Sequence, residues 1–270
     1  RIREDGQELS ALSPTGTKQF HIPMKFAQFY AGKAHNFDFD PDVTDFAIGF
    51  RSAARARKLD AFLALAEIEK INDFQKSAAL EQAASYKRKE AGPILEKIPV
   101  EFVKKTAQMQ HLIIQGKASE AITQFADEDF TQWPFWKRSD GYRNRGRAYY
   151  LIKNGDKAET DLRKALPWTS DPKVRDAIFL MLGRNRESNL GDDNGALEAY
   201  DTIVRDHERI GGADQFSAIQ GIARIQTRRD QFEDALKTLD RTNPTKLEGT
   251  WKKNILQSIQ EVKAARQLSP

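Results

Sequence analysis

A short block returns four times along this chain at an almost constant distance. Each copy consists of a polar turn, then an alanine, and then a large apolar residue four positions later. The alanines of successive copies are separated by 37, 38 and 39 residues: Ala121, Ala158, Ala196 and Ala235. A fixed period in this range is typical of stacked helical hairpins, because one hairpin cannot bury its apolar face alone. The sequence therefore predicts an all-α solenoid.

Composition agrees with this fold class but does not indicate a function. The chain has 270 residues, of which 39% are hydrophobic and 30% are charged, enough apolar material for a continuous core under a solvated surface. A formal net charge of +4 is a weak indication of nucleic-acid binding, since proteins of that class usually concentrate their charge more sharply. The sequence has no cysteine, which excludes disulfides, thiol nucleophiles and cysteine-ligated zinc.

Apolar patterns of helical period divide the chain into four segments. We expect an irregular leader over 1–40 packed on the solenoid, degenerate helical hairpins over 41–100, repeats over 101–246 and a capping helix over 247–270. Before the repeats, helices are expected from the capping residues Asp40–Asp45 to about Arg57, and over 59–71 and 74–89. Within the repeats the expected helix pairs are 101–114 with 118–128, 139–153 with 156–166, 172–188 with 194–207, and 213–228 with 231–241.

The leader contains an apolar cluster made of Phe20, Ile22, Met24, Phe26, Phe29 and Tyr30. The alternation of Phe20, Ile22 and Met24 indicates a short extended segment. We expect the cluster to pack along the first helices. A second interpretation makes it a docking element for a larger assembly.

The segment 142–172 carries the most specific pattern of the chain. Its small, aromatic and apolar residues fall at the spacing of a helical hairpin: Tyr142, Gly146, Tyr149, Ala158, Leu162, Ala165 and Pro172. On these residues the chain resembles the tetratricopeptide-repeat family, with Arg145 where the family prefers Leu and Pro172 about two residues late. Later units repeat the pattern through Leu182, Gly183, Ala196 and Tyr200, and then through Ala223, Phe232 and Ala235.

The resemblance covers roughly residues 101–265. It implies a right-handed superhelix whose concave wall is lined by the first helix of each hairpin. Proteins of this family usually bind peptides or protein segments on that wall, and they are almost never enzymes by themselves.

An arginine directly follows the small residue of the first helix in three consecutive units: Arg147, Arg184 and Arg224. The resemblance places this position on the concave groove. Stacked arginines there would form an anion-selective strip, because a guanidinium group grips a carboxylate through two hydrogen bonds. Arg143, one turn before Arg147, would extend the strip, and Tyr150 would supply an aromatic wall. The alternative is that these arginines are solvated or paired with acidic residues, of which the chain has 39.

The densest aromatic cluster is formed by Trp133, Phe135 and Trp136. Tryptophan beside arginine is typical of interface hot spots, so the cluster is a candidate anchor for a partner. The alternative, which we favour, is that it fills the seam between an irregular linker and the neighbouring repeats.

No motif of the sequence indicates catalysis, a cofactor or a metal. The alternating aspartates that begin at Asp38 lack the glycine and glutamate of a calcium loop, where this chain has Val43 and Gly49, and helix capping explains them better. The four histidines lack metal-ligand spacing, and the sequence has no phosphate-loop, dinucleotide or nucleophile-elbow fingerprint. We therefore predict a protein that is not an enzyme and that needs no metal or cofactor.

The leading prediction is a binding scaffold that recognises a protein or peptide segment of acidic or carboxylate character near Arg147, Arg184 and Arg224. The alternative is RNA or another polyanion on the basic strip, with Tyr150 or a tryptophan stacking on bases. A third interpretation is a helical accessory domain of a larger assembly. No stretch approaches the roughly 18 apolar residues of a membrane span, so we expect a soluble chain. It would be cytoplasmic, or exported after removal of a signal peptide, which the start at Arg1 fits.

Overall fold

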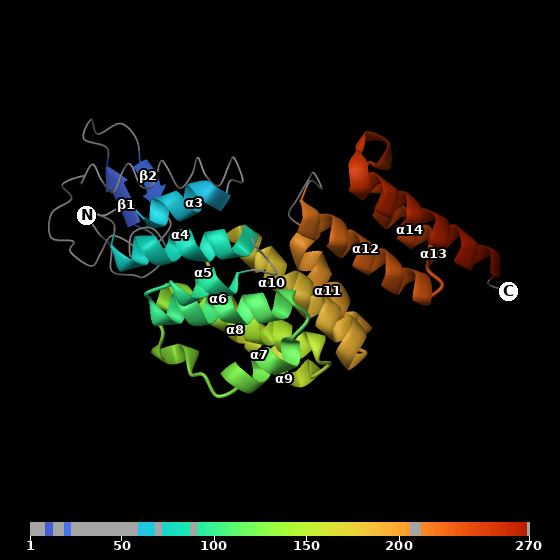
Figure 1. The fold of residues 1–270 in the computed structure, drawn as a ribbon. Helices are drawn as coiled ribbons and strands as arrows, with labels where there is room; N and C mark the ends of the chain where they lie inside the picture. The colour runs from blue at the N-terminus through green and yellow to red at the C-terminus, as the bar shows by residue number, and fades with distance from the viewer. Residues whose placement is uncertain are drawn as a thin grey trace. The chain divides into compact units, whose positions relative to one another are not determined.

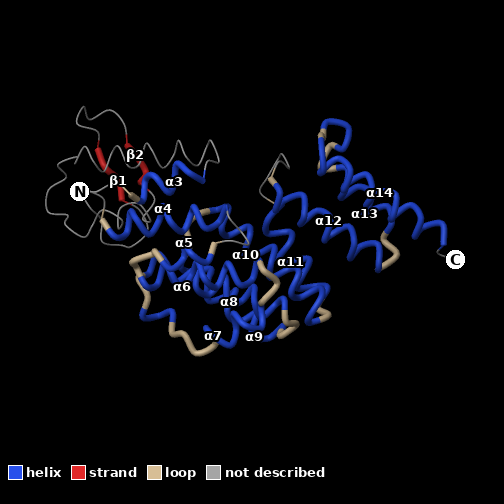
Figure 2. The backbone as a smooth tube through the Cα atoms, in the orientation of Figure 1, coloured by secondary structure: helices blue, strands red, loops and turns tan. Residues whose placement is uncertain are grey.

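The computed structural model of the chain describes residues 9–12, 19–22, 59–67, 72–86, 91–205 and 212–268. The described part is helical apart from one two-stranded hairpin, which confirms the all-α fold class (Figure 1). Figure 2 shows short loops between the helices. The expected helix ending near Arg57, the aspartates from Asp38 and most of the apolar cluster of the leader lie outside the described residues.

The chain divides into two compact units, Arg1–Ala148 and Tyr149–Pro270. In the first unit, β1 (Leu9–Leu12) pairs antiparallel with β2 (Gln19–Ile22), and β2 contains two residues of the expected extended segment, Phe20 and Ile22. The helices that follow are α3 (Leu59–Ala66), α4 (Asp73–Tyr86), α5 (Gly92–Glu96), α6 (Glu101–Ile114), α7 (Ala118–Phe125), the 3-10 helix η2 (Phe130–Gln132) and α8 (Phe135–Leu151). Helix α8 crosses the boundary between the units, so the predicted repeat segment 101–246 contributes residues to both.

The second unit contains the remaining hairpins. Its elements are α9 (Gly155–Ala165), η3 (Leu166–Trp168), α10 (Pro172–Asn185), the π-helical turn η4 (Arg186–Leu190), α11 (Asp193–Val204), α12 (Ala213–Arg228), α13 (Phe232–Asp240), η5 (Pro244–Lys246) and α14 (Gly249–Leu268). Helices α6 and α12 have the predicted bounds, and the other repeat helices begin and end within a few residues of their predictions. The short elements α5 and η4 were among those not predicted, because each has only 5 residues and therefore shows no periodicity.

Helices in the second unit pack in an alternating order. Helices α10, α12 and α14 contact one another in succession, while α11 packs against α10 and α12, and α13 against α12 and α14 (Figure 1). The four alanines of the repeat are fully buried and lie on α7, α9, α11 and α13. Three of the predicted helix pairs, α6 with α7, α10 with α11 and α12 with α13, are in contact, with a buried alanine on the second helix of each.

Tyr200 of α11 fills the seam between α10 and α12. Its ring is fully buried between two glycines, Gly183 on α10 and Gly221 on α12. A Cβ atom at Gly183 would lie 2.4 Å from Cε1 of this ring, and one at Gly221 would lie 2.5 Å from its Cε2. Neither contact is sterically allowed, so both glycines are required for the ring to fit between the helices.

Three first helices end in the same left-handed turn. The residues with positive φ are Gly116 after α6, Lys153 after α8 and Asp230 after α12, with φ of 78°, 61° and 58°. In each case the next residue donates its N–H to a carbonyl five positions earlier, as in a Schellman motif. In the turn before α9, Lys153 is the residue with positive φ. Gly155 belongs to α9 and packs against Leu190, whose Cδ2 would lie 2.6 Å from a Cβ added at Gly155.

Candidate functional site

Two of the three predicted strip arginines lie in the second unit. Arg184 directly follows Gly183, the glycine that packs against Tyr200, and Arg224 lies one turn after Gly221 on the other side of the same ring. Both side chains are exposed. Arg147 is also exposed but belongs to the first unit. The structure thus gathers Arg184 and Arg224 around one buried tyrosine.

The extension of the strip has contacts of its own. Arg143 donates to the carboxylate of Asp140 one turn before it, with 3.1 Å between Nη2 and Oδ1. Tyr150 is partly buried, and its backbone carbonyl accepts a hydrogen bond from Nδ2 of Asn189 at 3.0 Å. The contacts of Arg143 and the carbonyl of Tyr150 are therefore internal to the protein.

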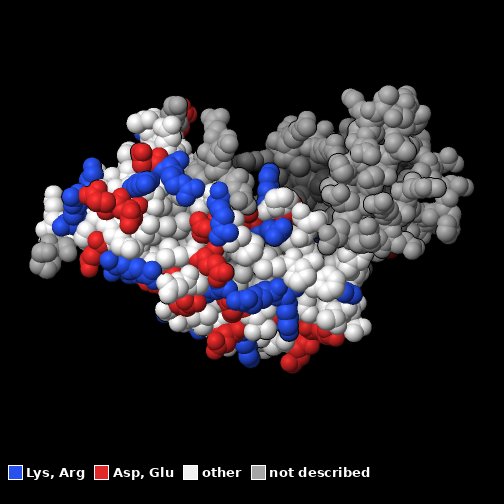
Figure 3. Space-filling view, turned by 180° about the vertical axis from the view of Figure 1, so that it is seen from behind, with Lys and Arg blue, Asp and Glu red and all other residues white. Residues whose placement is uncertain are grey.

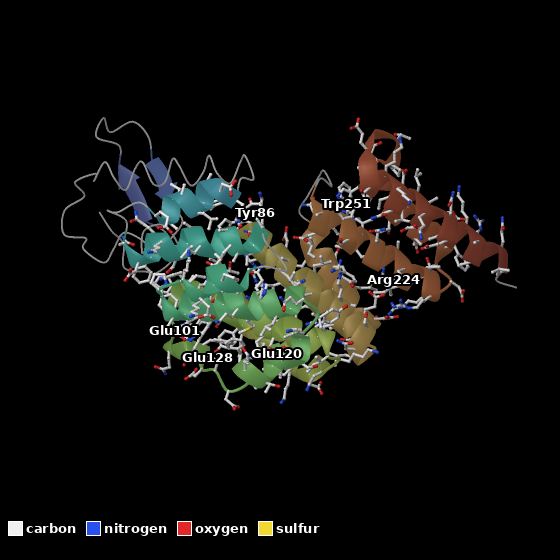
Figure 4. The ribbon with its side chains drawn as sticks, in the orientation of Figure 1. Tyr86, Glu101, Glu120, Glu128, Arg224 and Trp251 are labelled. Carbon is white, nitrogen blue, oxygen red and sulfur yellow. The ribbon has the colours of Figure 1, made fainter. Side chains whose placement is uncertain are left out.

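Arg224 forms a bidentate ion pair with Glu187. Its Nε lies 2.7 Å from Oε1 of Glu187, and its Nη2 lies 2.7 Å from Oε2 (Figure 4 labels Arg224 on α12). Arg228, one turn further along α12, adds a third hydrogen bond from Nη1 to Oε1 at 2.9 Å. Arg224 is therefore paired with an acidic residue, as the alternative interpretation of the strip stated.

Glu187 is the centre of this network. Only 5% of its side chain is exposed, and it accepts a fourth hydrogen bond from the hydroxyl of Tyr200 at 2.9 Å. Burial alone would raise the pKa of Glu187, but the hydrogen bonds from Arg224 and Arg228 outweigh it and lower the pKa to about 2. Burial beside this carboxylate raises the pKa of Tyr200. Glu187 is therefore ionised and Tyr200 neutral across the physiological pH range.

The π-helical turn η4 holds Glu187 in place. Arg186, its first residue, is buried and donates from Nε and Nη2 to Oε1 of Glu159 at 3.0 and 2.7 Å, and from Nη1 to the carbonyl of Gly195 at 2.8 Å. Asn189, in the same turn, donates to Oδ1 of Asn185 at 3.0 Å. Anchored in this way to neighbouring helices, the turn cannot easily move its carboxylate away from α12.

Arg184 differs from Arg224 in its partners. Within the described part of the chain it makes no hydrogen bond or ion pair, although its charge acts on a neighbouring carboxyl group. Burial raises the pKa of Asp214, at the start of α12, and the positive charge of Arg184 acts in the opposite direction. Arg184 is therefore the member of the strip whose guanidinium edge is available to a ligand.

The predicted aromatic anchor lies in the first unit and is largely packed. Trp133 is buried, its indole Nε1 donates to Oε1 of Glu128 at 2.9 Å, and its ring meets Phe130 edge to face at 4.7 Å between centroids. Trp136 is partly buried and packs edge to face on Phe102 at 5.5 Å. Phe135 is likewise partly buried. These contacts match the seam-filling interpretation.

Arg145, which departs from the family pattern, has a structural role in that seam. Its Nη1 donates to the carbonyls of Phe125, Ala126 and Glu128 at 3.2, 2.9 and 2.9 Å. These carbonyls lie at and just beyond the end of α7, where a helix leaves backbone acceptors unpaired. The guanidinium carbon also lies 4.5 Å from the centroid of the Phe130 ring. A leucine at this position would leave these carbonyls without that donor.

No group of three or more metal-ligating side chains occurs among the described residues. None of the described helices is both long enough and apolar enough to cross a lipid bilayer. On the face drawn in Figure 3, basic and acidic side chains are interspersed across the described surface. That mixture does not form a broad basic field.

Sequence reasoning missed Glu187 and Arg228 as members of the site. Glu187 contacts Tyr200, Arg224 and Arg228, which are 13, 37 and 41 residues away along the chain. A local pattern has no signal for contacts at such separations.

Comparisons of the chain with protein-family models, with curated proteins and with solved structures gave no match. The function must therefore be inferred from the geometry of the site.

Proposed function

We propose that this chain is a non-catalytic helical-repeat scaffold that binds an acidic protein or peptide segment. In this proposal the hairpins form a tetratricopeptide-like superhelix, the first helices line its concave groove, and Arg184 grips a carboxylate of the ligand. The observation that carries the proposal is that Arg184 is exposed on α10 and, within the described part of the chain, has no intramolecular hydrogen bond or ion pair.

The packing order of the second unit supports a groove of this kind. Helices α10, α12 and α14 contact one another in succession, so the first helices of two hairpins and the capping helix lie side by side. The face of α12 that carries Arg224 also carries the partly buried Ser217 and Gln220, and Nε2 of Gln220 donates to Oγ of Ser258 on α14 at 3.0 Å. Such a surface offers hydrogen-bonding groups to an extended ligand and a cation to an acidic one.

The charge around Tyr200 favours a protein ligand over a polyanion. Arg184, Arg224 and Arg228 lie among three acidic residues, Glu187, Asp193 and Asp214, so the local charges balance. Single-stranded nucleic acids are usually held in grooves with a positive excess. RNA binding is therefore the second candidate.

The test is affinity capture from native lysate at low and at moderate salt, with wild type, Arg184→Glu and a matched control. Arg205→Glu makes the same charge change directly after α11, at an exposed side chain of the same unit that is paired with Asp201. We expect wild type and Arg205→Glu to retain the same protein at both salt concentrations and Arg184→Glu to lose it. Equal retention by all three would show that Arg184 does not bind the partner.

A further inference from the structure

The arrangement of charge around α12 is unusual because the carboxylate is buried and its cations are exposed. The side chain of Glu187 is 5% exposed, whereas those of Arg224 and Arg228 are 53% and 43% exposed. An arginine side chain at the protein surface is solvated by water and does not need a buried partner. The protein nevertheless places a carboxylate under both of them, at the cost of desolvating it.

The pairing commits two nitrogens of each arginine to carboxylates. Arg224 uses Nε and Nη2 on Glu187, and Arg228 uses Nη1 on Glu187 and Nη2 on Asp193 at 2.6 Å. Two guanidinium groups are thereby matched by two carboxylates. A phosphate group that approaches this end of α12 meets arginines that are already neutralised.

Polyanion binding depends on cations that are free to neutralise phosphates. Each phosphate contact releases counterions, and for single strands the slope of log affinity against log salt changes by about 0.7 per contact. An internal carboxylate that competes for the same guanidinium groups removes those contacts. A protein can achieve specificity in this way, by weakening binding to the wrong ligand.

We propose that Glu187 is a specificity-determining residue that occupies Arg224 and Arg228 and so prevents RNA and similar polyanions from binding to this surface. Arg184 is left as the cation for a single carboxylate of a protein segment. This last point rests on the proposed function, whereas the exclusion of polyanions by Glu187 is independent of it.

The test is binding of a short fluorescein-labelled oligouridylate, followed by fluorescence anisotropy over a range of salt concentrations. Glu187→Gln keeps the shape of the side chain but removes its charge. We expect this variant to bind the RNA about tenfold more tightly than wild type at low salt, with a salt slope steeper by about 0.7 for each arginine released. Adding Arg224→Gln and Arg228→Gln to Glu187→Gln should abolish the gain.

The matched control is Glu233→Gln, on α13. It makes the same charge change at a residue that is also paired with an arginine, with 2.6 Å between its Oε1 and Nη1 of Arg266, but its side chain is 73% exposed. A gain in RNA affinity that is equal in Glu187→Gln and Glu233→Gln reflects net charge alone and overturns the proposal. No gain in a Glu187→Gln variant that is folded by circular dichroism overturns it as well.

A second variant decides the matter if Glu187→Gln does not fold. Asp193→Asn removes the other carboxylate of Arg228 and leaves Glu187 and Tyr200 in contact. We expect a smaller gain in RNA affinity, about threefold. The slope of log affinity against log salt should change by no more than about 0.7, the value for one phosphate contact. No gain in this variant, relative to Glu233→Gln, would overturn the proposal. The proposed function is tested separately, by whether Arg184→Glu loses the protein that wild type captures from lysate.

Discussion

In the first unit Arg145 turns its guanidinium into the protein, whereas in the second unit Arg224 holds its guanidinium at the surface over a buried carboxylate. Arg145 donates to backbone carbonyls beyond α7 and lies over the ring of Phe130. Arg224 donates to Glu187, which also binds Tyr200. Arginines on α8 and α12 thus bind chemically different partners, backbone carbonyls and an aromatic ring in one case and a carboxylate in the other.

The comparison shows that an arginine in repeat register is not by itself a sign of a binding strip. In the first unit the seam between hairpins is aromatic, with Phe130, Trp133 and Tyr142 packed together. In the second unit the seam holds one tyrosine ring between two glycines. In the aromatic seam the ring of Phe130 packs against the buried guanidinium of Arg145. In the other seam the hydroxyl of Tyr200 and the guanidinium of Arg224 both donate to the carboxylate of Glu187.

The largest effect is expected at the ring that fills the second seam. Tyr200→Ala should lower the free energy of unfolding by about 4 kcal/mol, because it leaves a large cavity between α10 and α12 and removes a donor from Glu187. Tyr200→Phe, which keeps the ring, should cost only about 1.5 kcal/mol. Urea denaturation followed by circular dichroism measures both. Equal costs would mean that the hydroxyl, rather than the ring, holds this seam together.

The next effect depends on pH. The pKa of Glu187 falls from its ordinary value of 4.5 to about 2 in the folded protein, so its contribution is fully present above the unfolded pKa. Glu187→Gln should therefore cost about 3 kcal/mol at pH 7. The difference between wild type and variant should shrink as the pH falls from about 4.5 through about 2. Urea midpoints of both proteins over this range test it, and a cost that does not change with pH would contradict the role of the charge.

In the first unit, Arg145→Leu should lower the free energy of unfolding by about 2 kcal/mol. The substitution introduces the residue that the tetratricopeptide pattern prefers, but it removes the Nη1 donor from three carbonyls near the end of α7. Arg145→Lys, which keeps a charge but not the planar fork, serves as the comparison. A stable Arg145→Leu variant would mean that packing, and not the hydrogen bonds, dominates this seam.

The smallest effect is expected at a turn. Lys153 has a φ of 61°, a conformation that costs little for glycine, and an equivalent turn after α6 uses Gly116. Lys153→Gly should therefore stabilise the protein by roughly 0.5 kcal/mol. This gain is reduced because glycine also raises the conformational entropy of the unfolded chain. Thermal denaturation measures the change. Lys157→Gly, in the first turn of α9, is the control and should destabilise by up to about 1 kcal/mol.

The sequence allowed most of the repeat helices to be predicted, together with the pairing of α6 with α7, α10 with α11 and α12 with α13. Periodic apolar residues gave the bounds of α6 and α12, and the recurring alanines identified the second helices, because a small residue is needed wherever two helices touch. Tyr200, the large residue four positions after Ala196, belongs to the same register. These features depend on neighbours close in sequence, which is why a pattern reveals them.

The polar part of the site was beyond such reasoning. Glu187 lies in a π-helical turn that periodicity does not predict, and its partners come from α11 and α12. Arg224 and Arg184 looked equivalent in the sequence, yet only Arg224 lies within reach of that carboxylate. Which arginine is paired depends on side-chain geometry across hairpins, and no spacing rule contains that information.

The most direct test of the account is selection of peptides from a random library on immobilised wild-type protein, with Arg184→Glu and Arg205→Glu in parallel. The account predicts that peptides enriched on wild type carry a carboxylate at a fixed position, bind Arg205→Glu equally well and no longer bind Arg184→Glu. Enrichment of peptides without an acidic residue, or equal binding to Arg184→Glu, would contradict it.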